Sequence, residues 1–217
     1  MKQLVRQKLR LIGHLYLIIF VFWGLYRLIF RLPDNIEEII LKPLVWLGPT
    51  FYIVFKVEKK GLASLGYSTK NFGSSLVKGL SFGTLFFLVG LSLNYLENGR
   101  LSIQSLPVKE FFLPSLLLSF ITAISEETVF RGYIMNRLSE ILKNELAANV
   151  VSSFGFCLVH LPITIFVYRY SLPQIFIFLS LVFLSSLGSG LVFSWTKTIW
   201  ASILVHVFWA WPVALLM

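Results

Sequence analysis

Seven long apolar runs constrain most strongly what this chain can fold into. The hydrocarbon core of a bilayer is roughly 30 Å thick, which about twenty residues of α-helix or about ten residues of β-strand can cross. Runs near twenty residues therefore predict helices, which make all their backbone hydrogen bonds within one segment, as lipid requires. The runs cover residues 11–30, 41–57, 79–96, 112–136, 147–168, 173–195 and 199–217.

The composition is that of a membrane protein. The 217 residues are 57% hydrophobic and 13% charged, and the mean hydropathy is +0.80, values outside those of soluble domains. We therefore predict an all-α fold, a polytopic transmembrane helical bundle of about seven spans. Pro43, Gly48 and Pro49 interrupt the second run, which membrane helices tolerate when neighbouring groups satisfy the freed backbone.

The distribution of Lys and Arg predicts the orientation. Cytoplasmic ends of membrane helices carry an excess of these residues. With seven spans, thirteen of the nineteen fall on the side of the N-terminus and six on the other side. The N-terminus is therefore predicted to be cytoplasmic. The net charge of +9 indicates attraction to anionic lipid, and the sequence shows no interleaved basic and aromatic groove typical of binding to nucleic acid.

Three charges interrupt the fourth run. Glu126, Glu127 and Arg131 would each cost roughly 2.5 to 3.5 kcal/mol near the bilayer centre, so their presence indicates a functional site. Glu127 and Arg131 are four residues apart, the spacing of a favourable helical ion pair. Glu126 lies about 100° from Glu127 around the helix and has no partner there, so it can project into a cavity and act on water. The alternative is a helix-packing ion pair near the cytosolic interface.

Two histidines are expected at a comparable depth. Phe156 and His160 are four residues apart and share one helical face, where the aromatic ring can orient the imidazole. His206 lies about two turns inside the last run. Counted from the cytoplasmic ends of their runs, Glu126, His160 and His206 are roughly 16, 20 and 10 Å deep at about 1.5 Å per residue. All three are therefore expected in the middle-to-inner bilayer.

These residues form three motifs in order along the chain. Glu126-Glu127 is followed by Arg131 and Gly132-Tyr133, Phe156 precedes His160, and Trp200-Ala201 leads to His206. The motifs resemble those of the type II CAAX prenyl protease and bacteriocin-processing family, also called CPBP or Abi, of glutamate-dependent intramembrane proteases. The resemblance covers about residues 112–210, and the N-terminal runs add only hydropathy to it.

The resemblance implies an intramembrane endopeptidase in which Glu126, with His160, activates water for attack on a peptide carbonyl. Glu127, Arg131 and Phe156 would support the site, and His206 would help to hold the oxyanion. In the family the third motif continues with Asn or Asp four residues after the histidine, where this chain has Ala210. Loss of one oxyanion donor costs roughly 2.7 to 4 kcal/mol in a soluble protease.

The departure at Ala210 leaves three alternatives. Another side chain or a water substitutes for the amide, catalysis is slow, or the chain is a catalytically impaired member of the family. In the last case we expect a membrane immunity or regulatory protein that binds a partner. A small proton-coupled carrier is less well supported, because the chain lacks the paired inverted halves common in transporters.

Two other catalytic chemistries are compatible with parts of the sequence. Glu126, His160 and His206 are also a ligand set for catalytic zinc with an open water position. The His-Glu-x-x-His motif is absent and the resemblance implies a metal-free mechanism, so we expect no cofactor and keep zinc as the alternative. Ser189 between two glycines, with His206, resembles the Ser-His pair of rhomboid proteases, but small residues are also what close helix packing in lipid requires.

We expect residues 1–217 to form a single membrane domain with the motif-bearing core at about 112–210. The resemblance and the short chain imply a multi-pass protein of a bacterial cytoplasmic membrane. The expected partners are the lipid bilayer and a peptide or membrane-protein substrate that enters laterally or from the cytosolic side. The sequence carries no signal for an oligomeric state.

Overall fold

The computed structural model describes residues 2–100 and 113–216, and the regular structure in these ranges is helical. Short π-helical segments extend several of the α-helices. The α-helices are α1 (Lys2–Ile29), α2 (Asp34–Ile36), α3 (Lys42–Tyr52), α4 (Phe72–Asn98), α5 (Leu113–Glu127), α6 (Asn136–Leu142), α7 (Glu145–Val159), α8 (Leu172–Thr196) and α9 (Ile199–Leu216). The π-helical segments are η1 (Glu37–Leu41), η2 (Ile53–Val57), η5 (Thr128–Met135) and η6 (Ile163–Val167), and η3 (Leu62–Leu65) is a 3₁₀ helix.

The predicted polytopic helical bundle is confirmed. Within the described residues, six helical segments are long and apolar enough to cross a membrane, and they coincide with the first six predicted runs. The seventh run falls on α9, whose apolar stretch of described residues, Ile199–Ala210, is shorter. The segments of spanning length are Lys2–Ile29, Glu37–Val57, Phe72–Leu96, Leu113–Leu142, Glu145–Val167 and Leu172–Thr196.

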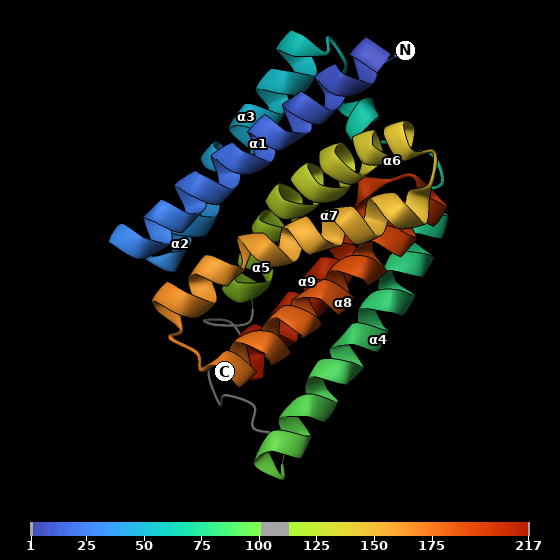
Figure 1. Cartoon of the computed structure of the whole chain (residues 1–217). Coiled ribbons are helices and arrows are strands. Elements are labelled where there is room, and N and C mark those ends of the chain that lie inside the picture. Colours follow the sequence, from blue (N-terminus) through green and yellow to red (C-terminus); the bar gives the residue numbers. More distant parts are fainter. Residues whose placement is uncertain (1, 101–112, 217) are drawn as a thin grey trace.

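The helix that carries Glu126 lies in the middle of the bundle. Figure 1 shows α1 and α3 side by side along one edge, α5 and α7 in the middle, and α4, α8 and α9 toward the other side. Helix α5 packs against both α3 and α9, and α9 in turn packs against α4 and α8. The N-terminal and C-terminal helices therefore meet at α5.

Helix starts follow from local sequence. The side chain of Asn144 accepts a hydrogen bond of 3.0 Å from the backbone N–H of Ala147 and caps α7. Ser171 and Gln174 form a reciprocal capping box at the start of α8, which satisfies backbone donors that a helix leaves unpaired. Pro43 lies in the first turn of α3, where its missing N–H is tolerated. These caps fix where α7 and α8 begin.

Buried cations are paired inside the bundle. Arg27 and Lys42 are only 7% and 4% exposed, whereas the topology assignment had treated both as charges at outer helix ends. Arg27 pairs with the buried Glu37, and Lys42 with Glu38 and Glu126. On the predicted cytoplasmic side, Arg131 and Arg137 are likewise buried. Removing two cations from each side keeps the asymmetry that predicts the orientation.

A glycine sets one close approach between distant segments. A Cβ atom at Gly132 would lie 2.8 Å from the backbone oxygen of Leu65, in η3, whereas one at Gly13 in α1 would meet nothing within 4 Å. Backbone cannot yield as a flexible side chain can. The 3₁₀ helix η3 therefore docks on η5 because position 132 has no side chain.

We predict that Gly132→Ala lowers stability by about 1–3 kcal/mol, since overpacking a tight contact forces backbone shifts. The matched variant Gly13→Ala should leave stability unchanged or raise it by up to about 1 kcal/mol, because Ala favours the helix. Thermal unfolding in detergent measures the difference in stability between the two variants. The yield of monodisperse protein is a second readout. Equal stability of the two variants would contradict the packing assigned to Gly132.

Candidate active site

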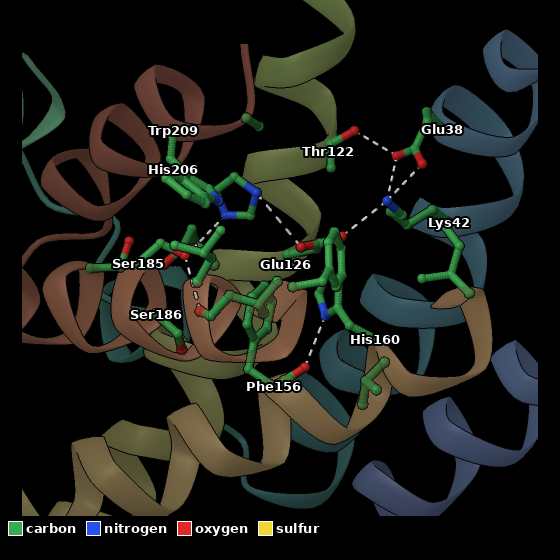
Figure 2. A pocket seen from close by; sticks show the side chains of 18 of the residues that line it. Glu38, Lys42, Thr122, Glu126, Phe156, His160, Ser185, Ser186, His206 and Trp209 are labelled. Carbon is green, nitrogen blue, oxygen red and sulfur yellow. Dashed lines mark hydrogen bonds and ion pairs between the residues drawn. The ribbon is translucent and has the colours of Figure 1, made fainter. Parts of the chain in front are cut away.

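The three motifs meet at one internal cavity. It has a volume of about 410 Å³, and its lining includes Glu126, His160 and His206 together with Ala210. The walls come from α1, α3, α4, α5, α7, α8 and α9. Figure 2 shows the side chains of Glu126, His160 and His206 turned toward one another from separate helices. Residues far apart in the sequence are thus brought within reach of a common small molecule or peptide group.

Glu126 lies at the last α-helical turn of α5, immediately before the π-helical segment η5. Such wide turns are frequent at functional sites. The residue is 4% exposed, and its Oε1 accepts a hydrogen bond of 2.9 Å from Lys42 Nζ. Its Oε2 faces His206 Nε2 at 3.7 Å. The carboxylate therefore has one engaged oxygen and one oxygen directed at the histidine.

Glu127 connects the other charged groups of the site. Its Oε1 accepts hydrogen bonds from Arg131 Nη1 at 3.1 Å and from His206 Nδ1 at 2.7 Å. Arg131 also donates from Nη2 to the backbone oxygen and the hydroxyl of Ser186, at 2.7 and 2.6 Å. Both members of the pair are buried. Glu127 thus orients the His206 ring, and Arg131 ties η5 to α8.

Phe156 packs between the two histidines. Its ring centroid lies 4.5 Å from that of His160 and 6.1 Å from that of His206, and the Arg131 guanidinium lies 5.0 Å from it. His160 Nδ1 donates to the backbone oxygen of Phe156 at 2.9 Å. In the neutral ring this leaves Nε2 with a free lone pair. Phe156 therefore fixes the positions of both imidazoles.

Sequence analysis did not identify two residues of the site. Lys42 and Glu38 both line the cavity, and Glu126, which was expected to have no partner on its own helix, receives its ion pair from Lys42 on α3. The signal available in the sequence was the i, i+4 spacing of Glu38 and Lys42 at the start of an apolar run. Their proximity to Glu126 depends on the packing of α3 on α5, which periodicity does not specify.

The position expected to hold Asn or Asp in the family also faces the cavity. Ala210 is part of the lining, and its methyl side chain has no hydrogen-bond donor. Asn94 on α4 is 8% exposed and lines the same cavity. An amide is therefore present in the wall, on a helix that packs against α9.

Ser189 has a packing role in the described structure. Its hydroxyl donates to the backbone oxygen of Ser202 at 3.3 Å, and the Ser202 hydroxyl donates to the backbone oxygen of Ser189 at 3.0 Å. A Cβ atom at Gly190 would overlap the Asn149 side chain. This reciprocal pair joins α8 to α9 at close range, as small residues do in membrane bundles.

The side chains of the site are not arranged as a zinc site in this structure. Among the residues that the structure describes, no group of three or more His, Cys, Asp or Glu side chains is arranged to hold a metal. The Lys42 ammonium, 2.9 Å from Glu126 Oε1, is a positive charge that a nearby divalent cation would oppose. The metal-free mechanism stays a prediction, with zinc as its alternative.

Comparison with known proteins identifies the motif-bearing half. A family model described as type II CAAX prenyl endopeptidase Rce1-like matches residues 108–212. Residues 108–212 belong to this family. The resemblance inferred from the three motifs is thereby confirmed for this segment, and six apolar helices among the described residues make the chain a multi-pass membrane protein. No curated protein and no solved structure gave a significant match.

We predict that Arg131→Ala reduces the folded yield of this protein. Removing one partner of a buried ion pair costs about 3–5 kcal/mol, because the other charge is left buried. Lys197→Ala is the control, since Lys197 and Glu145 form an exposed pair, with side chains 60% and 49% accessible, worth about 0–1 kcal/mol. Size-exclusion profiles and thermal unfolding in detergent report both. Full yield with lost activity in Arg131→Ala would instead assign Arg131 to the chemistry.

Proposed function

We propose that this protein is an intramembrane endopeptidase that hydrolyses a peptide bond with Glu126 as general base and His160 as its partner. The convergence of Glu126, His160 and His206 on one cavity carries the proposal. Membership of the Rce1-like family supports it at the level of protease activity. The positions of these three side chains support the role proposed for each of them.

Water activation is the first step. A water molecule between Glu126 and His160 gives a proton to the Glu126 carboxylate, and its oxygen bonds to the carbonyl carbon of the substrate. The carbonyl π electrons move to oxygen and form an oxyanion. Burial of the site strengthens these interactions, because competing water is excluded. The Glu126 oxygen that faces His206 is the acceptor, since Lys42 engages the other.

Collapse of the intermediate is the second step. The oxyanion re-forms the carbonyl, the carbon–nitrogen bond breaks, and the leaving nitrogen takes the proton held by Glu126. In its imidazolium form, His206 donates Nδ1–H to Glu127 Oε1 and presents Nε2–H to the oxyanion, which stabilises the developing charge. Glu127 and Arg131 hold this ring through their contacts with α8 and η5.

The substrate that fits this cavity is a peptide or the tail of a membrane protein. The cavity wall includes Trp23, Trp46 and Phe178, a surface suited to apolar side chains. We place the N-terminus in the cytoplasm of a bacterial cell. In that orientation a substrate segment enters laterally or from the cytosol.

A second function is favoured by one observation, the alanine at position 210. A catalytically impaired member of the family would retain the cavity and act as an immunity or regulatory protein that binds a membrane partner. The two functions differ in their dependence on the general base. A phenotype that survives Glu126→Gln at normal expression would support partner binding.

We predict that Glu126→Gln and His160→Ala reduce cleavage by about 10²–10⁴-fold with the protein still folded, as expected for loss of general acid–base groups. Cleavage of quenched peptides and candidate membrane proteins in nanodiscs measures the effect. Glu145→Gln, which alters an exposed carboxylate outside the cavity, should retain activity. Equal rates in wild type and Glu126→Gln would contradict the mechanism.

We predict that Ala210→Asn increases kcat by about tenfold or more, because a single oxyanion donor can contribute roughly 2.7–4 kcal/mol. Ala210→Leu adds similar volume without a donor and should not increase kcat. The two variants are compared under saturating substrate in nanodiscs. An unchanged kcat in Ala210→Asn would show that another group already supplies the contact.

A further inference from the structure

Lys42 forms an ion pair with Glu126 from outside the Rce1-like segment, whereas His206, whose Nε2 lies 3.7 Å from Glu126 Oε2, belongs to that segment. Residues 108–212 supply Glu126, Glu127, Arg131 and both histidines. Helix α3, from the N-terminal half, contributes the ammonium group. The chemistry of the family motifs is therefore coupled in this chain to a charge that the motifs do not contain.

The Lys42 ammonium is shared by two carboxylates. Its Nζ lies 2.9 Å from Glu126 Oε1 and 2.7 Å from Glu38 Oε1. Glu38 is fixed in turn by Thr122 on α5, whose Oγ1 donates to Glu38 Oε2 at 2.5 Å. Figure 2 shows this bridge entering the cavity from the side opposite His206. Four side chains from η1, α3 and α5 thus form one continuous hydrogen-bonded unit.

The surroundings of Lys42 are apolar and aromatic. Its side chain is 6% accessible, and Nζ lies 5.6 Å from the Trp23 ring and 6.0 Å from the Trp46 ring. Water contributes little to balancing charge here, so the ammonium interacts strongly with its carboxylate partners. Faces of aromatic rings add attraction for the cation. Lys42 is therefore held as a fixed positive charge beside Glu126.

A general base must exist in two charge states, and each has a problem in a buried site. The ionised carboxylate needs a counter-charge, since an unpaired buried charge takes up a proton instead. Once Glu126 has accepted the proton from water, its counter-cation would in turn lose its partner, which is unfavourable. Glu38 removes the second problem, because Lys42 keeps one ionised partner in either state.

We propose that Lys42, held by Glu38, is a positioning residue for the general base. It keeps Glu126 ionised before the reaction and engages Oε1, so that Oε2 is the oxygen that takes the proton from water. Glu38 stays paired with Lys42 while Glu126 is protonated. The assignment rests on the proposed function, and it extends the machinery beyond the family-matched segment to η1 and α3.

Activity measurements distinguish a positioning role of Lys42 from a role in stabilising the fold alone. Lys42→Met should lower kcat by about 100-fold, as misplacement of a catalytic group does, with KM within about threefold of wild type. Lys42→Arg restores a cation and should recover about tenfold or more of the lost kcat. Glu58→Gln is the matched control. It disrupts the buried pair of Glu58 with Arg137, whose side chains are 9% and 1% accessible, and Glu58 is not part of the cavity wall.

Infrared spectroscopy tests the same assignment without any substrate. In Glu38→Gln, Lys42 still pairs with Glu126, so no additional protonated-carboxyl C=O stretch is expected. In Glu38→Gln/Lys42→Met, Glu126 loses its counter-cation and should show that band at neutral pH. The triple variant with Glu126→Gln should lose the band, which assigns it to Glu126. This readout is independent of whether a substrate has been found.

The outcomes separate this inference from the proposed function. Glu126-dependent cleavage that is unaffected by Lys42→Met would overturn the role of Lys42 and leave the protease function in place. A raised KM with unchanged kcat would make Lys42 a substrate-binding residue and would also overturn it. Folded wild type without cleavage would overturn the proposed function, whereas the infrared comparison would still decide whether Lys42 sets the charge of Glu126. Identical infrared spectra of Glu38→Gln and Glu38→Gln/Lys42→Met would show that Lys42 does not set the charge of Glu126, and would overturn the inference.

Discussion

Balance of buried charge is the constraint on which this bundle depends. Lipid offers no water to stabilise an isolated ion, and the buried ions of the described residues are paired within a helix or between helices. Glu127 is the clearest case, because it joins Arg131 on its own helix to His206 on α9. Arg131 extends the connection to Ser186 on α8. The same contacts that make the charges tolerable also bring the three motifs to one cavity.

Two parts of the chain supply different chemical groups to the cavity. The Rce1-like segment provides Glu126, His160, His206 and the ring of Phe156 between the two histidines. The N-terminal helices provide the cation on Glu126 and an apolar wall. A site of this kind is preorganised, because its dipoles and charges are fixed by packing before a substrate arrives. Ala210, where the resemblance leads us to expect Asn or Asp, contributes no hydrogen-bond donor to the cavity wall.

Much of this could be predicted, for identifiable reasons. The apolar runs predicted the helical bundle because a membrane span has a fixed length. The i, i+4 spacing of Glu127 and Arg131 predicted their contact, which the structure contains. The placement of Glu126, His160 and His206 around one cavity agrees with their estimated depths, while their catalytic roles stay predictions. The topology assignment of Lys42 and Arg27 to outer helix ends overlooked their burial, since counting charges does not show which of them point inward.

The sequence by itself determined the helical membrane class and the motif-bearing half, because these depend on local length, spacing and side-chain chemistry, and it predicted which residues act on water. Tertiary structure decided the partner of Glu126, the orientation of both imidazoles and the packing role of Ser189. Those depend on which helices pack together and on the rotation of each about its axis. Lys42 and Glu126 are 84 residues apart in sequence, and only the packing of α3 on α5 brings the ammonium to the carboxylate.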